Sequence, residues 1–277
     1  MLDDTLQRQL IKAGREFTRG FTEDDPYMED FESDQDLRKP QPPLVQPAMA
    51  DNKIEFTRDF STLELKNDLV ELIRDRRSSR VYTGEIVTKE QLSFLLWATQ
   101  GVKTMRGKSY ATIRTVPCGG ARHEFETYLL VRHVEGLEPG AYHYLPLEHA
   151  LEFLHPVSNI EDAITNSLDE QKWAEKANVV FYWTMVPYRA EWRYGIYAHR
   201  VAMIDVGHIG QNLYLACTGA GLGTCAIGAF SHEVCNELFG LDGEEEYVVY
   251  TAPVGTVRES DRAAEQAFYR FVEEEGL

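Results

Sequence analysis

The chain has 277 residues, 43% of them hydrophobic, which allows one large domain or two of ordinary size. Its formal net charge of −17 argues against nucleic acid, whose phosphates are bound largely by Lys and Arg, and against an anionic membrane surface. The first thirty residues are polar and acidic, which argues against a signal peptide, and no apolar run reaches membrane-spanning length. The four cysteines lack C-x-x-C spacing, which favours free thiols in a reducing cytoplasm over a zinc site.

Residues 1–57 do not have the pattern of a folded domain and are predicted to form an arm. Residues 6–17 favour a short amphipathic helix, and residues 23–36 contain eight acidic side chains and no basic one. Four prolines within residues 40–47 favour an extended path. Two interpretations stay open: a disordered acidic arm, or a strap that wraps a partner subunit. The anchors of such a strap would be Tyr27, Met28, Phe31, Leu44 and Val45.

Residues 58–257 are predicted to form the folded domain, and residues 258–277 a helical tail. Helices are expected at 63–76, at 92–100 after a capping box at 88–91, at 159–176 and at 231–239. Strands are expected at 125–131, 178–186 and 247–253, with a hairpin of 141–144 and 150–154. Loops are expected at 103–114 and 187–193. Because strands and helices alternate, the class is α+β or α/β with a mixed sheet.

The longest helix is predicted to run from residue 194 to a glycine-rich stop at 219–223. It is apolar nearly all round and is therefore expected to be buried on every side, in the core of a domain or of a dimer. A Rossmann fingerprint would follow a strand and open a helix, so the reversed order here favours a helix stop. Residues 225–230 are then expected to form a buried strand of small residues, against whose backbone a flat ligand can lie.

A run rich in arginine, residues 74–80, contains four arginines in seven positions of an acidic chain. One interpretation is that these cations are stabilised by the dipole at the end of a helix. The other is an anion site, in which arginine and serine bind a phosphate through charge-assisted hydrogen bonds of about 1.5–3 kcal/mol each. The Pro-Cys-Gly-Gly turn at 117–120 is a second place where small residues let a backbone approach a ligand.

The sequence gives little support for catalysis by side chains of the protein. No nucleophile has a base beside it, and no set of metal ligands has convincing spacing. His199, Asp205 and His208 lie along the long helix and are interpreted as buried polar contacts at a helix interface. The arginine-rich run, the turn and the small-residue strand together favour binding of a phosphorylated, flat cofactor, and no catalytic residue is assigned.

These segments, in this order, resemble the nitroreductase-like flavoprotein family, specifically its branch of SagB-type dehydrogenases, which includes peptide azoline oxidases. The resemblance covers residues 60–257, and the Pro-Pro-Leu-Val of the arm resembles leaders in this branch. The matching motifs are RRSSR at 76–80, PCGGARH at 117–123, VEGLEPGAYHY at 134–144, DVGHIGQNL at 205–213 and GLGTC at 221–225.

The resemblance implies an α+β, nitroreductase-like fold with a mixed, mostly antiparallel sheet flanked by helices and a long central dimer helix. It implies an intertwined homodimer with FMN at the subunit interface. Arg76 would bind the phosphate, Ser78 the phosphate or ribityl chain, and Arg80 the flavin N1/O2 edge, where a cation stabilises the reduced anionic flavin. The cofactor-binding residues are then Arg76, Arg77, Ser78, Arg80, Pro117, Cys118, Gly119, Ala226, Ile227, Gly228 and Ala229.

Two features of this assignment concern other parts of the chain. The turn at Pro117, Cys118 and Gly119 would come from the other subunit, and Cys118 stands where the family usually has serine. A basic residue of the C-terminal tail would also reach the phosphate. The candidates are Arg258, Arg262 and Arg270.

The resemblance implies an FMN-dependent oxidoreductase that transfers hydride through flavin N5 to or from a small organic substrate, with NADH or NADPH as a possible donor. One alternative is an azoline-type peptide oxidase. Such enzymes in the family use a Lys-Tyr pair as a base, and residues 187–199 hold no clear pair of this kind. The other alternative is a non-catalytic flavin-fold subunit that scaffolds a complex through its arm.

Overall fold

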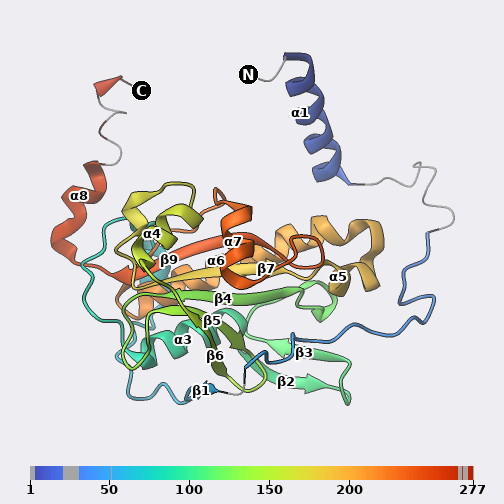
Figure 1. The fold of residues 1–277 in the computed structure, drawn as a ribbon, viewed down its shortest axis with the longest axis horizontal. Helices are drawn as coiled ribbons and strands as arrows, with labels where there is room; N and C mark the ends of the chain where they lie inside the picture. The colour runs from blue at the N-terminus through green and yellow to red at the C-terminus, as the bar shows by residue number, and fades with distance from the viewer. Residues whose placement is uncertain (1–3, 21–30, 51, 268–269, 271–273, 277) are drawn as a thin grey trace.

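A seven-stranded antiparallel sheet forms the centre of the computed structural model, which describes residues 4–20, 31–50, 52–267, 270 and 274–276 (Figure 1). The strand order is β1-β6-β5-β4-β7-β9-β8, and each neighbouring pair is antiparallel. The strands are β1 Lys53–Glu55, β4 Phe125–Val131, β5 Gly140–Leu145, β6 Ala150–Pro156, β7 Val179–Met185, β8 Leu222–Thr224 and β9 Tyr247–Thr256. The predicted α+β class with a mostly antiparallel sheet is confirmed.

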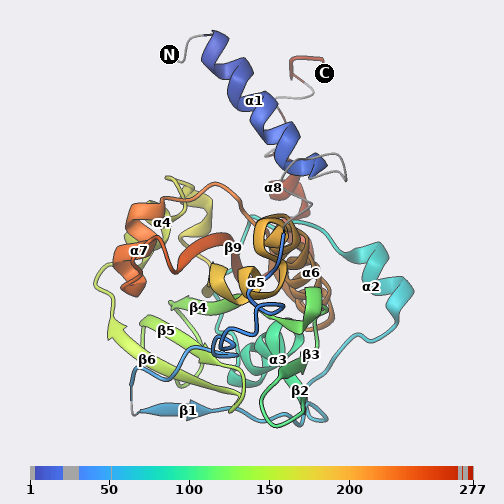
Figure 2. The same cartoon turned by 90° about the vertical axis from the view of Figure 1, so that its right-hand side faces the viewer.

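Helices cover both faces of the sheet, so the protein has three layers (Figure 2). On the interior strand β7, Phe181 and Trp183 enter one hydrophobic core, whereas Val180 and Tyr182 enter the other. The first core is closed by α3, Lys89–Gln100, and α6, Ala198–Gly219; the second by α4, Ile160–Ser167, and α7, His232–Phe239. Burial on both faces explains why β4 and β7 are mostly apolar, with Glu126 and Thr127 of β4 and Thr184 of β7 as buried polar exceptions.

The long helix α6 has 22 residues and was expected to be buried all round. One side packs on the sheet through Val206, Ile209 and Leu213. The other side is open in the single chain, where Met203 is 43% and Ile204 is 55% exposed. The chain by itself therefore covers only one face of this apolar helix.

Three local predictions are wrong in the type of element, and the helix predicted at 159–176 is the shorter α4 followed by the 3₁₀ helix Lys172–Ala174. Residues 187–193 belong to helix α5, Pro187–Tyr194, because Pro187 occupies the first turn, where a missing N–H is tolerated. Residues 103–114 lie largely in a hairpin of β2, Val102–Arg106, and β3, Ala111–Arg114; its first strand is mostly exposed and so lacks apolar alternation. Residues 225–230 pair with the sheet only at Ile227, opposite Thr251, and the strand before them is β8.

Capping signals in the sequence predicted the starts of helices more reliably than composition predicted the loops. The capping box at Thr88 and Gln91 is present, and Ser231 caps α7. Helix α2, Leu69–Asp75, starts later than predicted because Asp68 accepts a hydrogen bond from the Glu71 N–H. The tail holds α8, Arg262–Ala267. The short 3₁₀ helices are Gly119–Ala121, Lys172–Ala174, Gly195–Tyr197 and Glu259–Asp261.

The N-terminal arm has two described parts. Helix α1, Asp4–Arg19, stands away from the body, with Leu10 55% and Ile11 51% exposed (Figure 1). Residues 31–50, called the strap below, run along the body of the same chain and lead into β1 at the sheet edge. Of the predicted anchors, Phe31 packs edge-on against Tyr197, and Tyr27 and Met28 lie outside the described residues. No helix within the described ranges is long and apolar enough to cross a membrane.

Candidate cofactor site

Tyr214 of α6 joins the two segments that were assigned to the cofactor within one chain. Its hydroxyl accepts a hydrogen bond from the Ala226 N–H at 2.9 Å and lies 3.0 Å from Ser78 Oγ. The Arg76 guanidinium lies over the Tyr214 ring, 5.3 Å from its centroid. The arginine–serine run and the small-residue segment, far apart in sequence, are therefore neighbours. We call residues 76–80, Tyr214 and 225–229 the cradle.

Close backbone approach shapes the cradle. The Ser79 N–H donates to the Thr224 carbonyl at 2.9 Å, and a Cβ on Gly223 would lie 2.7 Å from Ser79 Cβ. Glycine at 223 therefore lets the run lie against β8. At Gly228 the surroundings differ, because a Cβ there would have no atom within 4 Å. Ile227 ties the segment to Thr251 by backbone hydrogen bonds, which leaves Gly228 and Ala229 exposed beside it.

The arginine side chains of the cradle contact either a carboxylate of the C-terminal tail or an aromatic ring. Arg77 forms an ion pair with Glu259 at 3.6 Å, and the Arg80 guanidinium lies 5.9 Å from the centroid of Trp173. Among the tail arginines, Arg258 pairs with Glu85 and Arg270 is exposed, whereas the side chain of Arg262 is outside the described residues. Burial raises the pKa of the Cys225 thiol beside Ser78 and Tyr214, which keeps it neutral.

The turn at Pro117, Cys118 and Gly119 lies at another part of α6. The Gly119 N–H donates to Asp205 Oδ2 at 2.8 Å, and a Cβ on Gly119 would lie 2.5 Å from Val201 Cγ1. Asp205 precedes Tyr214 by roughly 13 Å along the helix axis. One chain therefore does not bring the turn to its own cradle.

Cys118 belongs to a cluster that sequence spacing did not reveal. Its ligand atom and those of Glu124 and Asp205 lie within 4.8 Å of one another. The Cys118 thiol donates to Glu124 Oε2 at 3.3 Å, and Glu124 Oε1 has no hydrogen-bond partner among the described residues. Burial raises the pKa of Glu124 to about 7 and that of Cys118 well above its usual range, so Cys118 stays protonated at neutral pH, whereas Glu124 is mostly protonated only below about pH 7.

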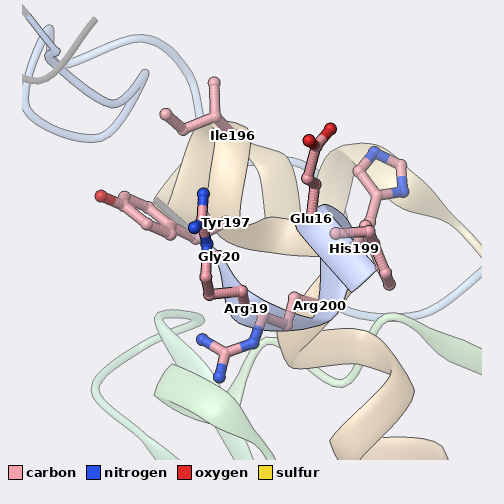
Figure 3. Close-up of a pocket in the computed structure, with 8 residues that line it drawn as sticks. Glu16, Arg19, Gly20, Ile196, Tyr197, His199 and Arg200 are labelled. Carbon is pink, nitrogen blue, oxygen red and sulfur yellow. The ribbon is translucent and has the colours of Figure 1, made fainter. Parts of the chain in front are cut away.

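The other polar side chains of the long helix have separate roles. Asp205 is buried, as the interpretation of a polar helix contact requires. His199 and His208 are 45% and 46% exposed, and they lie 2.9 Å from Glu191 and 3.7 Å from Asp205. A pocket of about 520 Å³ next to His199 and Arg200 lies between α1 and the start of α6 (Figure 3). Arg200 precedes Tyr214 by roughly 21 Å along the helix, so this pocket is separate from the cradle.

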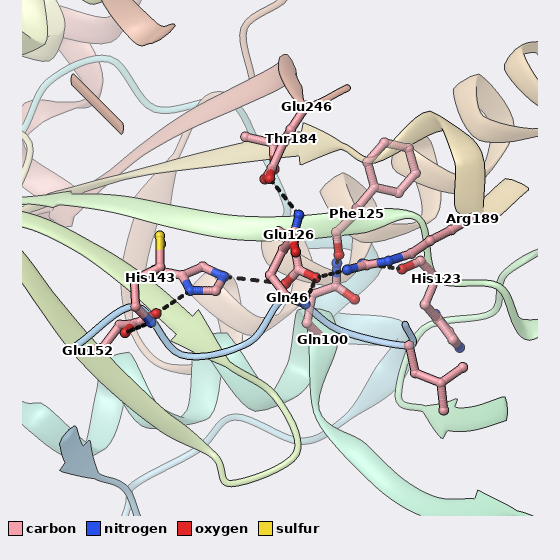
Figure 4. Close-up of polar contacts among 12 residues, drawn as sticks. Gln46, Gln100, His123, Phe125, Glu126, His143, Glu152, Thr184, Arg189 and Glu246 are labelled. Carbon is pink, nitrogen blue, oxygen red and sulfur yellow. Dashed lines mark hydrogen bonds and ion pairs between the residues drawn. The ribbon is translucent and has the colours of Figure 1, made fainter. Parts of the chain in front are cut away.

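A buried charge network lies under the strap (Figure 4). Arg189 Nη2 is 2.6 Å from Glu126 Oε1, and His143 lies between Glu126 at 3.4 Å and Glu152 at 2.7 Å. The strap completes it, because the Gln46 N–H donates to Glu126 at 2.7 Å and the Met49 and Ala50 N–H groups donate to Glu152. We call Glu126, His143, Glu152 and Arg189 the strap anchor.

The strap anchor has perturbed proton affinities. Burial alone would lower the pKa of His143, but hydrogen bonds to Glu126 and Glu152 outweigh it and raise the pKa to about 9. Burial opposes ionisation of Glu126 as well, yet Arg189 and His143 lower its pKa to about 2. The network therefore holds a charged imidazole and two carboxylates at neutral pH.

Comparison with known proteins places the chain in a family. The Nitroreductase family model matches residues 73–256. A protein of Methanocaldococcus jannaschii named as a nitroreductase is 32% identical over 201 residues, which cover 71% of this chain and 93% of that protein. The chain belongs to the nitroreductase family.

A second relative has a different name. The trifolitoxin-processing protein TfxB of Rhizobium leguminosarum is 29% identical over 186 residues. The match covers 64% of this chain and 45% of TfxB, so the chain corresponds to about half of that protein.

Solved structures confirm the fold. A nitroreductase-like protein of Ralstonia eutropha superposes with a TM-score of 0.61 at 22% identity, over 80% of this chain and 95% of that one. A chain of the Escherichia coli microcin synthetase McbBCD complex, solved with truncated pro-MccB17 bound, gives a TM-score of 0.56 at 17% identity, over 93% of this chain and 95% of that one. The similarity to the McbBCD chain is one of fold, and the sequence similarity to TfxB supports the SagB-type branch.

Proposed function

We propose that the protein is an FMN-dependent oxidoreductase that acts as a homodimer with FMN at the subunit interface. The observation that carries this proposal is the convergence of Arg76, Ser78 and the segment 226–229 on Tyr214, within the fold of the nitroreductase family. Bound FMN would supply hydride transfer, with NADH or NADPH as the donor and a small organic molecule as the substrate. A cytoplasmic location is consistent with four free cysteines.

The donor set of the cradle fits a flavin mononucleotide. Arg76 and Ser78 offer a guanidinium and a hydroxyl to a phosphate, and Arg77 adds a second cation at that end. Arg80 would place a cation at the pyrimidine edge, where negative charge gathers on reduction. The open backbone at Gly228 and Ala229 matches a flat ring, because a Cβ at 228 meets no other atom within 4 Å.

A second copy of the chain would complete the site. The turn at 117–119 is roughly 13 Å along α6 from Tyr214, too far to serve its own cradle. The open face of α6, with Met203 and Ile204, supplies apolar surface that a twin helix can bury. In this arrangement Pro117, Cys118 and Gly119 of one subunit close the cradle of the other. The domain division into the arm 1–57, the domain 58–257 and the tail 258–277 is part of the proposal.

A peptide substrate is the second candidate. The similarity to TfxB, named for the processing of trifolitoxin, favours it. Incubation with an azoline-containing peptide, followed by mass spectrometry for a loss of two hydrogens, tests it directly. A protein that binds FMN but is reduced by neither NADH, NADPH nor any substrate would instead be a scaffold subunit.

FMN binding by purified protein tests the proposal. Arg76→Ala removes a charge-assisted bond of about 2 kcal/mol and should weaken FMN binding by roughly thirtyfold in a fluorescence titration. Arg74→Ala, an exposed arginine of α2 in the same run, is the matched control and should leave the affinity unchanged. A colourless protein that takes up no FMN would overturn the cofactor assignment, and a monomer in light scattering would overturn the shared site.

A further inference from the structure

The C-terminal tail places a carboxylate in the arginine–serine run. Glu265 of α8 is half-buried, and its Oε1 accepts hydrogen bonds from the backbone N–H of Arg80 at 2.5 Å and of Val81 at 2.7 Å. Burial raises the pKa of the Cys225 thiol in the cradle, and the negative charge of Glu265 adds to that rise. The tail carboxylate thus lies at the edge of the cradle.

Two consecutive N–H groups that converge on one oxygen form a concave anion-binding position in the backbone. Such a position does not discriminate between a carboxylate and another anion, because it offers only donors and a positive potential. The guanidinium groups of the run add to that potential. Glu265 therefore occupies a place that an external anion can also take.

Among the described residues, two exposed ion pairs also connect the tail to this region. Arg77 and Glu259 are 39% and 69% exposed, and Arg258 and Glu85 are 57% and 61% exposed. Exposed ion pairs of this kind stabilise a contact little, because water and salt screen them. These two ion pairs therefore add little to the hydrogen bonds by which Glu265 holds the tail at the run.

We propose that the amides of Arg80 and Val81 form an anion-binding position at the edge of the cofactor site, and that Glu265 occupies it until an anionic ligand displaces the tail. This inference rests on the proposed function, since FMN would be the displacing ligand, with its phosphate taking the place of the Glu265 carboxylate at these backbone amides while Arg76 and Ser78 contact it from the same run. The tail is then a competitor whose docking reduces the apparent affinity. If it is docked for about nine-tenths of the time, the apparent Kd is about tenfold higher than in its absence.

The first test is an FMN titration of wild type, Glu265→Ala and Glu275→Ala. Glu275 is an exposed carboxylate of the same tail and serves as the matched control for charge. Glu265→Ala should bind FMN about tenfold more tightly, and Glu275→Ala should equal wild type. Equal affinities for all three proteins would overturn the inference and leave the proposed function standing.

Amide hydrogen exchange gives a readout that does not depend on activity. Saturation with FMN should accelerate exchange in residues 262–267, while the Arg80 and Val81 amides stay protected. Unchanged exchange in the tail would overturn the inference. If none of the proteins binds FMN, the proposed function fails, and inorganic phosphate then serves as the probe of the anion-binding position. Slower exchange of the Arg80 and Val81 amides of Glu265→Ala in phosphate would support the position. Unchanged exchange of these amides would overturn it.

Discussion

The strap anchor and the cradle both gather charged side chains, and they do so in opposite ways. In the strap anchor, Glu126, His143, Glu152 and Arg189 are each at most 2% exposed, and each lies within 3.4 Å of an opposite charge. In the cradle, Arg77 is 39% exposed and its ion pair at 3.6 Å is with the tail. Charges matched inside the chain hold the fold together, whereas cations at an open surface are available to a ligand.

The largest expected effect comes from breaking the strap anchor. Arg189→Met leaves Glu126 buried without its nearer cation, with only His143 at 3.4 Å, and removing one partner of a buried pair typically destabilises by about 3–5 kcal/mol. Urea unfolding, followed by tryptophan fluorescence, measures the change. Lys53→Met removes an exposed pair with Glu148 and should change the free energy of unfolding by less than about 1 kcal/mol. Equal losses in the two variants would contradict the contrast between buried and exposed charge.

The second effect is a dependence of stability on pH. The pKa of His143 is about 9 in the folded protein and 6.5 in the reference state, so its contribution is complete below pH 6.5 and disappears as the pH rises through 9. A rise of this size corresponds to about 3 kcal/mol of stability. The burial-raised pKa of Glu124, about 7, acts in the same direction between pH 4.5 and 7.

Urea unfolding at pH 6, 7.5 and 9 tests this dependence. Wild type should lose stability between pH 6.5 and 9, and His143→Gln should lose much less over that interval although it starts lower. Parallel curves for the two proteins would show that His143 does not carry the dependence.

The elements that could be predicted from sequence are those set by local interactions. The capping box at Thr88 is completed within four residues, and the buried strands β4 and β7 are mostly apolar. The hairpin β2–β3 was missed because its first strand is mostly exposed, so burial imposes no alternation on it. Helix α5 was missed because its charged and aromatic residues hid the start signal of Pro187.

The residues of the candidate site also divide into those that the local sequence reveals and those that it does not. The run 76–80 and the segment 226–229 stand out by composition, and the family resemblance joined them into one site. Tyr214 could not be found, because a hydroxyl on an apolar helix has no local signal until Ser78 and Ala226 fold against it. Glu124 and Glu265 were missed for the same reason, since their partners depend on tertiary contacts.

A smaller effect is expected at Tyr214, where the cradle is held together. Tyr214→Phe removes the hydroxyl that accepts from Ala226 and bonds to Ser78. Loss of a bond of about 1 kcal/mol should weaken FMN binding about fivefold and lower the free energy of unfolding by about 1 kcal/mol. Tyr188→Phe, which removes an exposed hydroxyl contact with Asp34, should leave FMN binding unchanged. Equal FMN affinity of wild type and Tyr214→Phe would exclude Tyr214 from the site.

The smallest change in stability, and the sharpest separation of fold from site, is expected at Gly228. A Cβ there meets no atom within 4 Å, so Gly228→Ala should leave the free energy of unfolding within about 0.5 kcal/mol of wild type. The same methyl group would stand where a flat ring is proposed to lie, so FMN binding should fall by at least tenfold. Gly223→Ala should instead change the stability of the protein. Its Cβ would clash with Ser79 and Val257 and lower the free energy of unfolding by about 1–3 kcal/mol. Normal FMN affinity in a fully stable Gly228→Ala protein would remove residues 226–229 from the cofactor site, while the strap anchor and the fold would be unaffected.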